Sequence, residues 1–209
     1  MRTENARRWI VAVTFLVGVV ALSFTLRLEP GDDLFFAATF ALALLWAVGA
    51  VLAGARYRRG RFGARWSLAL GIASGATLLA ASLAAALVVA RIPALAEPAD
   101  TLLDHASGGA FVPIFVLTAV NGIAEELFFR GALYDALPTR LAIPVTTAAY
   151  TLTTVGTGVA LLVLAAACLG ALTAVLRRHT GELLAPTAAH LTWSLGMLVL
   201  LPTALATGS

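Results

Sequence analysis

Long apolar runs, separated by short polar or basic segments, constrain the fold of this chain more than any other feature of its sequence. A helix needs about 20 mainly apolar residues to cross roughly 30 Å of bilayer hydrocarbon. Seven runs approach that length, at approximately residues 9–26, 34–55, 66–90, 111–129, 141–157, 158–176 and 183–202. The division between the fifth and sixth runs rests on the GTG at 156–158, so residues 141–176 fit either two full spans or a re-entrant arrangement. The sequence therefore predicts an all-α, polytopic transmembrane helical bundle of about seven spans.

Composition and the placement of charge agree with this prediction. The chain is 60% hydrophobic and 12% charged, with a mean hydropathy of +0.93, unlike a soluble domain. All 14 basic residues are arginine, and most of them lie near the ends of apolar runs, in MRTENARR, RYRRGRFGAR, the turn with Arg140, and RRHTG. Arginine near a helix end favours the cytoplasmic side. We therefore expect a multi-pass protein of the plasma membrane with a cytoplasmic N-terminus, membrane lipid as a partner, and no nucleic-acid partner.

The organisation along the chain is simple. Residues 1–110 are expected to hold three N-terminal spans and residues 111–203 a core of about four spans, together one membrane domain. The first run is followed by SFTLRLEPGDD, which has no signal-peptide cleavage site, so we expect a retained anchor. The small residues of GIASGATLLAASLAAA predict close helix packing, and Cys168 is expected to be a buried packing thiol. No inverted repeat is evident, which disfavours a small transporter.

Three charges lie together in NGIAEELFFRG, residues 121–131, inside an otherwise apolar run. Ionisable residues within a span are functional candidates by default. On a helix, Glu126 and Arg130 stand four residues apart and are predicted to form an ion pair. Glu125 is turned about 100° away, which leaves it as a candidate general base, and Asn121 lies one turn earlier, where its amide can orient that carboxylate or donate to an oxyanion. The alternative is that these charges snorkel into headgroups at the cytoplasmic interface.

Three motifs resemble one known family. AEELFFRGALYDAL resembles the first motif of the CPBP intramembrane proteases, which include type II CAAX prenyl endopeptidases and the bacteriocin-processing or self-immunity (Abi) proteins. RRHTGELLAPTAAHLTWSLGM is similar to the last motif, with His190 matching and Ser194 in place of asparagine. The best counterpart of the middle motif is AYTLTTVGTG, with Tyr150 as the aromatic residue and Thr154 where the family has histidine. The resemblance covers roughly residues 111–203.

The resemblance implies an intramembrane endopeptidase that hydrolyses a peptide bond of a membrane-associated protein or peptide, which can be lipidated. It implies that Glu125 activates water together with His190, and that Glu126 and Arg130 form a structural or tuning pair. Ser194 keeps a hydrogen-bond donor where the family has an amide.

Thr154 is the serious departure, because a hydroxyl does not exchange protons near neutral pH as imidazole does. It favours the alternative of a non-catalytic family member that acts as a membrane binding or scaffold protein, or in bacteriocin self-immunity. The arginine- and alanine-rich composition suggests a high-GC bacterium.

No cofactor or metal is expected. The alternative is zinc held by Glu125 and His190, which is disfavoured because a catalytic zinc site normally has three protein ligands. By the predicted topology, the other two histidines, His105 and His179, lie in loops away from the motif.

Overall fold

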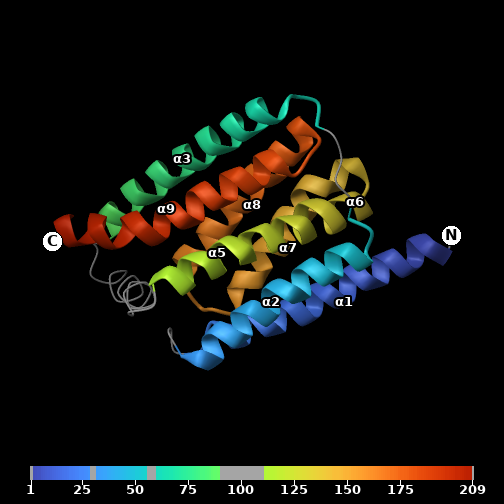
Figure 1. Cartoon of the computed structure of the whole chain (residues 1–209), viewed down its shortest axis with the longest axis horizontal. Helices are drawn as coiled ribbons and strands as arrows, with labels where there is room; N and C mark the ends of the chain where they lie inside the picture. Colours follow the sequence, from blue (N-terminus) through green and yellow to red (C-terminus); the bar gives the residue numbers. More distant parts are fainter. Residues whose placement is uncertain (1, 29–31, 56–59, 90–110, 209) are drawn as a thin grey trace.

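The computed structural model describes residues 2–28, 32–55, 60–89 and 111–208 (Figure 1). These ranges are all-α and contain no strand. The elements in chain order are α1 (Arg2–Thr25), α2 (Asp33–Leu52), α3 (Ala64–Val89), α5 (Phe111–Glu126), the π-helical η1 (Leu127–Leu133), the short α6 (Tyr134–Ala136), α7 (Thr139–Val155), α8 (Ala160–Thr180) and α9 (Leu184–Gly208). Because α5, η1 and α6 follow one another without a break, they act as one long helix.

Six helical segments of the described chain are long and apolar enough to cross a membrane, and the protein is accordingly a multi-pass membrane protein. They correspond to six of the seven predicted runs, and the remaining run, 141–157, is α7, which has only 17 residues. α7 and α8 are separate helices that pack against each other, and the link between them uses Gly158 at a φ of +73°.

Successive long helices reverse direction and so gather the basic segments at one end of the bundle. The backbone N–H of Arg61, before α3, donates to the carbonyl of Thr180, at the end of α8, at 2.8 Å. The guanidinium of Arg178 in turn donates to the carbonyl of Thr139, at the start of α7, at 2.8 Å. We call this the basic end; it holds the starts of α1, α3, α7 and α9.

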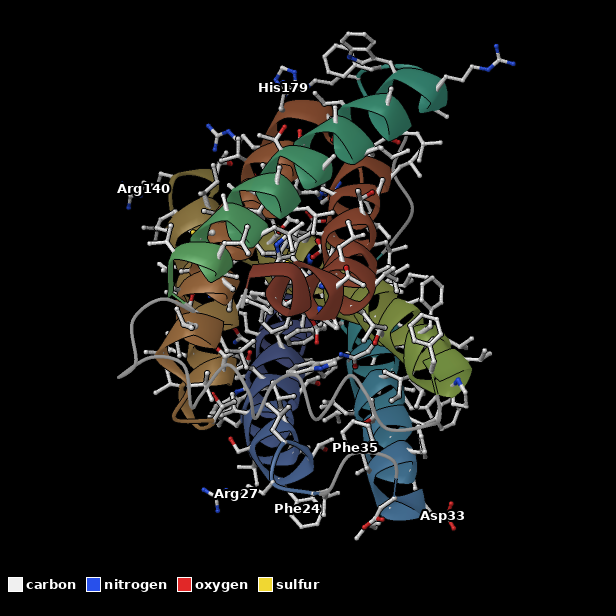
Figure 2. All side chains as sticks on the ribbon, turned by 90° about the vertical axis from the view of Figure 1, so that its left-hand side faces the viewer. Phe24, Arg27, Asp33, Phe35, Arg140 and His179 are labelled. Atoms are coloured by element: carbon white, nitrogen blue, oxygen red, sulfur yellow. The ribbon has the colours of Figure 1, made fainter. Side chains whose placement is uncertain are left out.

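The opposite end, called the far end below, holds the ends of α1 and α7 and the start of α2. In Figure 1 the N-terminus lies beside α6, away from the C-terminus. Arg27 and Asp33, beside the end of α1 and at the start of α2, belong to the far end, whereas Arg140 and His179, in the first turn of α7 and the last turn of α8, belong to the basic end; Figure 2 labels all four. The distribution of charge along the sequence therefore becomes a difference between the two ends of the bundle.

The tightest helix pair is α3 against α9, which run side by side (Figure 1). Gly71 and Gly75 of α3 face the backbone of α9, where an added Cβ would touch the carbonyl oxygens of Ala185 and Ala189. Such close approach needs residues without side chains. The predicted role of the small residues in helix packing is thus confirmed, and the packing fixes the turn of α9 that comes just before His190.

Aromatic packing holds the other side of the bundle. The Trp46 ring of α2 lies 4.8 Å from the ring centroid of Phe128 and 5.1 Å from that of Phe129, and all three side chains are buried. These rings anchor η1 against α2. Cys168 differs from the prediction of a buried packing thiol, because it is exposed and lines a cavity of the bundle.

The α3–α9 contact gives a direct test of this packing. We expect Gly75→Ala to lower the free energy of unfolding by about 1–3 kcal/mol, because its methyl group would overlap the Ala189 backbone. Gly63→Ala is the matched control, since nothing lies within 4 Å of the Cβ that it would add. Thermal unfolding in detergent measures both variants, and equal melting temperatures would contradict this account of the contact.

Candidate active site

The two adjacent glutamates end α5, where the helix changes from α to π geometry. Residues 127–133 form the π-helical η1, and π-helical turns recur at functional sites. The side chain of Arg177, on α8, donates from Nε to the backbone carbonyl of Arg130 at 2.8 Å, inside the bundle. This bond satisfies a carbonyl of the π segment and ties it to α8.

Arg130 and Glu126 form the predicted ion pair. The guanidinium Nη1 lies 3.2 Å from Glu126 Oε1, and both side chains are completely buried. Arg130 also donates from Nη2 to the carbonyl of Gly170 at 3.0 Å, and its guanidinium lies 4.7 Å from the ring centroid of Tyr150. Because protein surrounds both charges, the alternative that they snorkel into headgroups is wrong for this pair.

Glu126 also contacts the motif histidine. His190 Nδ1 lies 2.9 Å from Glu126 Oε1. The Glu126 carboxylate, paired with Arg130, accepts hydrogen bonds, so Nδ1 is the donor in this contact. Nε2 points toward Glu125, at 3.8 Å from Oε2. Glu126 thus orients His190, a contact that residue spacing could not reveal because 64 positions separate the two residues.

Glu125 is held from both sides. The amide of Asn121 donates to Oε1 at 2.6 Å, so the predicted orienting contact is present. The hydroxyl of Tyr150 donates to Oε2 at 2.9 Å. This bond was not predicted from the sequence, where Tyr150 stands only as the aromatic residue of the middle motif; the phenol hydroxyl at that position was the signal for it. Both carboxylate oxygens of Glu125 therefore have a fixed donor.

The two residues that depart from the motif differ in their contacts. The Thr154 hydroxyl donates to the carbonyl of Thr151, within its own helix, at 2.8 Å. The Ser194 hydroxyl is buried and has no hydrogen-bond partner in the part of the chain that the structure describes. It lies one turn after His190 on α9, as the sequence predicted. Ser194 is thus a donor free for a further acceptor, whereas Thr154 is already bonded.

Glu125, His190, Thr154 and Ser194 line one cavity of about 630 Å³. Beyond these polar groups its walls are mainly apolar and come from α1, α2, α3, α5, α8 and α9. At 1.5 Å per helical residue, His190 lies about 9 Å from the start of α9 and Glu125 about 16 Å from the end of α6. The polar groups therefore lie inside the bundle, nearer its basic end, and the apolar walls continue toward the far end.

The comparison with protein families agrees with this geometry. Residues 107–196 match the family of type II CAAX prenyl endopeptidases described as Rce1-like. They form an Rce1-like family domain. Every polar residue placed around the cavity above falls within this range. No curated protein and no solved structure matches the chain.

The Rce1-like domain offers few residues for a metal. In the described ranges no three His, Cys, Asp or Glu side chains are grouped in a way that could hold a metal ion. The zinc alternative at Glu125 and His190 would thus rest on two protein ligands, one fewer than catalytic zinc sites have. His179 lies in the last turn of α8, not in a loop, and is exposed beside Phe62; His105 lies outside the described residues.

The ion pair between Glu126 and Arg130 predicts which of two substitutions destabilises the protein more. Arg130→Ala should lower the free energy of unfolding by about 3–5 kcal/mol, because it leaves the Glu126 carboxylate buried without its cation. Glu125→Gln keeps the side-chain shape and should cost about 1 kcal/mol. Melting temperatures in detergent compare the two. Exposed Arg140→Ala serves as the control, expected within about 0.5 kcal/mol of native. A larger loss for Glu125→Gln than for Arg130→Ala would contradict this account.

Proposed function

We propose that this protein is an intramembrane endopeptidase that hydrolyses a peptide bond of a membrane-associated protein or peptide, with water activated by Glu125. The observation that carries the proposal is the approach of His190 Nε2 to Glu125 Oε2, at 3.8 Å, at the polar end of a cavity in an Rce1-like domain. Intramembrane proteolysis needs water, a base and a peptide bond to meet inside the bilayer. A buried carboxylate beside an oriented imidazole supplies the base and two groups that can hold the water.

The chemistry follows from the contacts of each group. A water between Glu125 and His190 gives one proton to Glu125 and donates its other hydrogen to His190 Nε2, while its oxygen attacks the scissile carbonyl carbon. The free hydroxyl of Ser194 donates to the oxyanion that forms. When the carbon–nitrogen bond breaks, Glu125 returns its proton to the departing nitrogen. Glu126 and Arg130 stay ionised throughout and keep the imidazole in its orientation.

The membrane orientation is also a proposal. By the positive-inside rule the basic end faces the cytoplasm, which gives a cytoplasmic N-terminus in the plasma membrane. The cleaved bond then lies about 9–16 Å below the cytoplasmic surface, by the helix rise used above. A substrate with an attached hydrocarbon chain suits the cavity, because the walls beyond the polar groups are apolar.

A second candidate is a non-catalytic family member that binds a membrane partner, for example in bacteriocin self-immunity. The observation that favours it is Thr154, which stands where the family has histidine and whose hydroxyl is bonded to Thr151. Loss of one general acid or base typically costs about 10²–10⁴ in rate. Binding would survive such a loss, since the cavity does not depend on Thr154 being basic.

The two candidates make different predictions for cleavage. In proteoliposomes supplied with membrane-extracted peptides, we expect Glu125→Gln and His190→Ala to cleave about 10²–10⁴ times more slowly than the native protein, since each removes a group that acts on the water. His179→Ala, at an exposed position in the last turn of α8, is the control and should cleave at the native rate. Peptide products are measured by mass spectrometry.

Cleavage at equal rates by all variants, or by none, would refute the protease proposal; peptides retained by an inactive native protein would instead support the binding candidate. Addition of EDTA decides the metal question, because a glutamate mechanism keeps its activity. Activity that EDTA removes and zinc restores would establish the zinc alternative.

Ser194 allows a separate test of the oxyanion role. Ser194→Ala should lower kcat by about 10²–10³, the usual loss when one oxyanion donor is removed. Ser194→Asn restores a donor, the one found in the family motif, and should keep most of the activity. A kcat that does not change in Ser194→Ala would remove this residue from the mechanism.

A further inference from the structure

We propose that the hydroxyl of Tyr150 positions Glu125 as the base, in place of the histidine that the family has at the position of Thr154. This inference rests on the proposed function for its catalytic consequence but on geometry for the contact itself. Tyr150 donates to Glu125 Oε2 at 2.9 Å, in the interior of the bundle, and lines the cavity. Thr154, one turn further along α7, bonds to Thr151 instead.

The ring of Tyr150 is fixed by contacts that do not involve its hydroxyl. Its centroid lies 5.1 Å from that of Phe129 and 6.1 Å from that of His190, both edge to face. The guanidinium of Arg130 lies over the ring, and a Cβ added at Gly170 would be only 3.3 Å from Tyr150 Cδ1. The ring therefore keeps its place without the hydroxyl, which is held on the carboxylate rather than free to rotate away.

With Asn121 on Oε1 and Tyr150 on Oε2, the plane of the Glu125 carboxylate is set by two donors on opposite oxygens. Asn121 comes from the same helix, one turn earlier, and alone would allow the carboxylate to turn about its Cγ–Cδ bond. Tyr150 comes from α7 and removes this freedom. It is thus a positioning residue that acts through Glu125 and does not itself need to touch the substrate.

The kinetic test uses Tyr150→Phe, which removes only the hydroxyl. We expect kcat to fall about 10²-fold with KM unchanged, because a misplacement of about 1 Å in the reacting geometry costs that much. Tyr134→Phe is the matched control: it removes the same atom from a ring that lies 5.3 Å from the Arg177 guanidinium, away from Glu125. A native kcat in Tyr150→Phe, or a loss seen only as a raised KM, would overturn the proposal.

Replacement of the missing histidine is tested by rescue. Adding Thr154→His to Tyr150→Phe restores the aromatic and histidine pair of the family motif, and we expect kcat to recover at least tenfold over Tyr150→Phe. A purely structural role of the hydroxyl would not be rescued by imidazole one turn away. Failure to recover in a variant that melts at the native temperature would refute the exchange of tyrosine for histidine.

An infrared measurement separates this inference from the proposed function. The carboxylate stretching bands of Glu125 are identified by their loss in Glu125→Gln, and we expect them to shift in Tyr150→Phe but not in Tyr134→Phe. This result needs no cleavage. If the native protein cleaves nothing, the protease proposal fails, while shifted bands still establish that Tyr150 holds Glu125 and unchanged bands overturn that contact.

Discussion

The fully buried ion pair between Glu126 and Arg130 is the interaction on which the rest of the site depends. Charges inside a membrane protein are tolerated when each is paired and its remaining hydrogen-bonding groups are satisfied. Arg130 is paired with Glu126, and its guanidinium also reaches the carbonyl of Gly170 on α8 and the ring of Tyr150 on α7, which satisfies part of its hydrogen-bonding capacity. The pair and the further contacts of Arg130 therefore join three helices at one point, and the contacts to Gly170 and Tyr150 form only when those helices are assembled.

The same pair gives the two adjacent glutamates different contacts. Neighbouring residues on a helix point about 100° apart, so Glu126 faces Arg130 and His190 while Glu125 faces Asn121, Tyr150 and the cavity. Because the Glu126 carboxylate is paired with Arg130, its Oε1 accepts a hydrogen bond from His190 Nδ1. The other ring nitrogen, Nε2, is then directed at Glu125. One charge pair thus sets the orientation of a residue on a distant helix.

The part of this site that sequence could predict is the part that is local. The Glu126–Arg130 pair and the Asn121–Glu125 contact follow from a spacing of four residues on one helix. The contact between Glu126 and His190 does not, because it depends on how α9 is placed, and that placement is set by the glycines of α3 against Ala185 and Ala189. The long helices followed from the apolar runs. The exposure of Cys168 did not, because an apolar run gives no sign of a cavity beside it.

The bond from Tyr150 to Glu125 also joins two helices, α7 and α5. It offers a replacement for the histidine that the family motif has at the position of Thr154. Where a motif loses a residue, the function of that residue can pass to a neighbour whose side chain reaches the same atom. Tyr150 lies four residues before Thr154 on the same face of α7. It meets this condition because its hydroxyl donates to the Glu125 carboxylate.

The cavity places a limit on how a substrate of the proposed protease could be selected. A hydrocarbon chain that moves from the bilayer into an apolar cavity exchanges one apolar environment for another, and therefore gains little from the hydrophobic effect. The apolar walls admit such a chain without strongly attracting it. Discrimination must then come from the polar end, where Ser194 offers an unused donor and Glu125 and His190 hold their positions. On this argument the peptide, rather than the hydrocarbon, supplies most of the specificity.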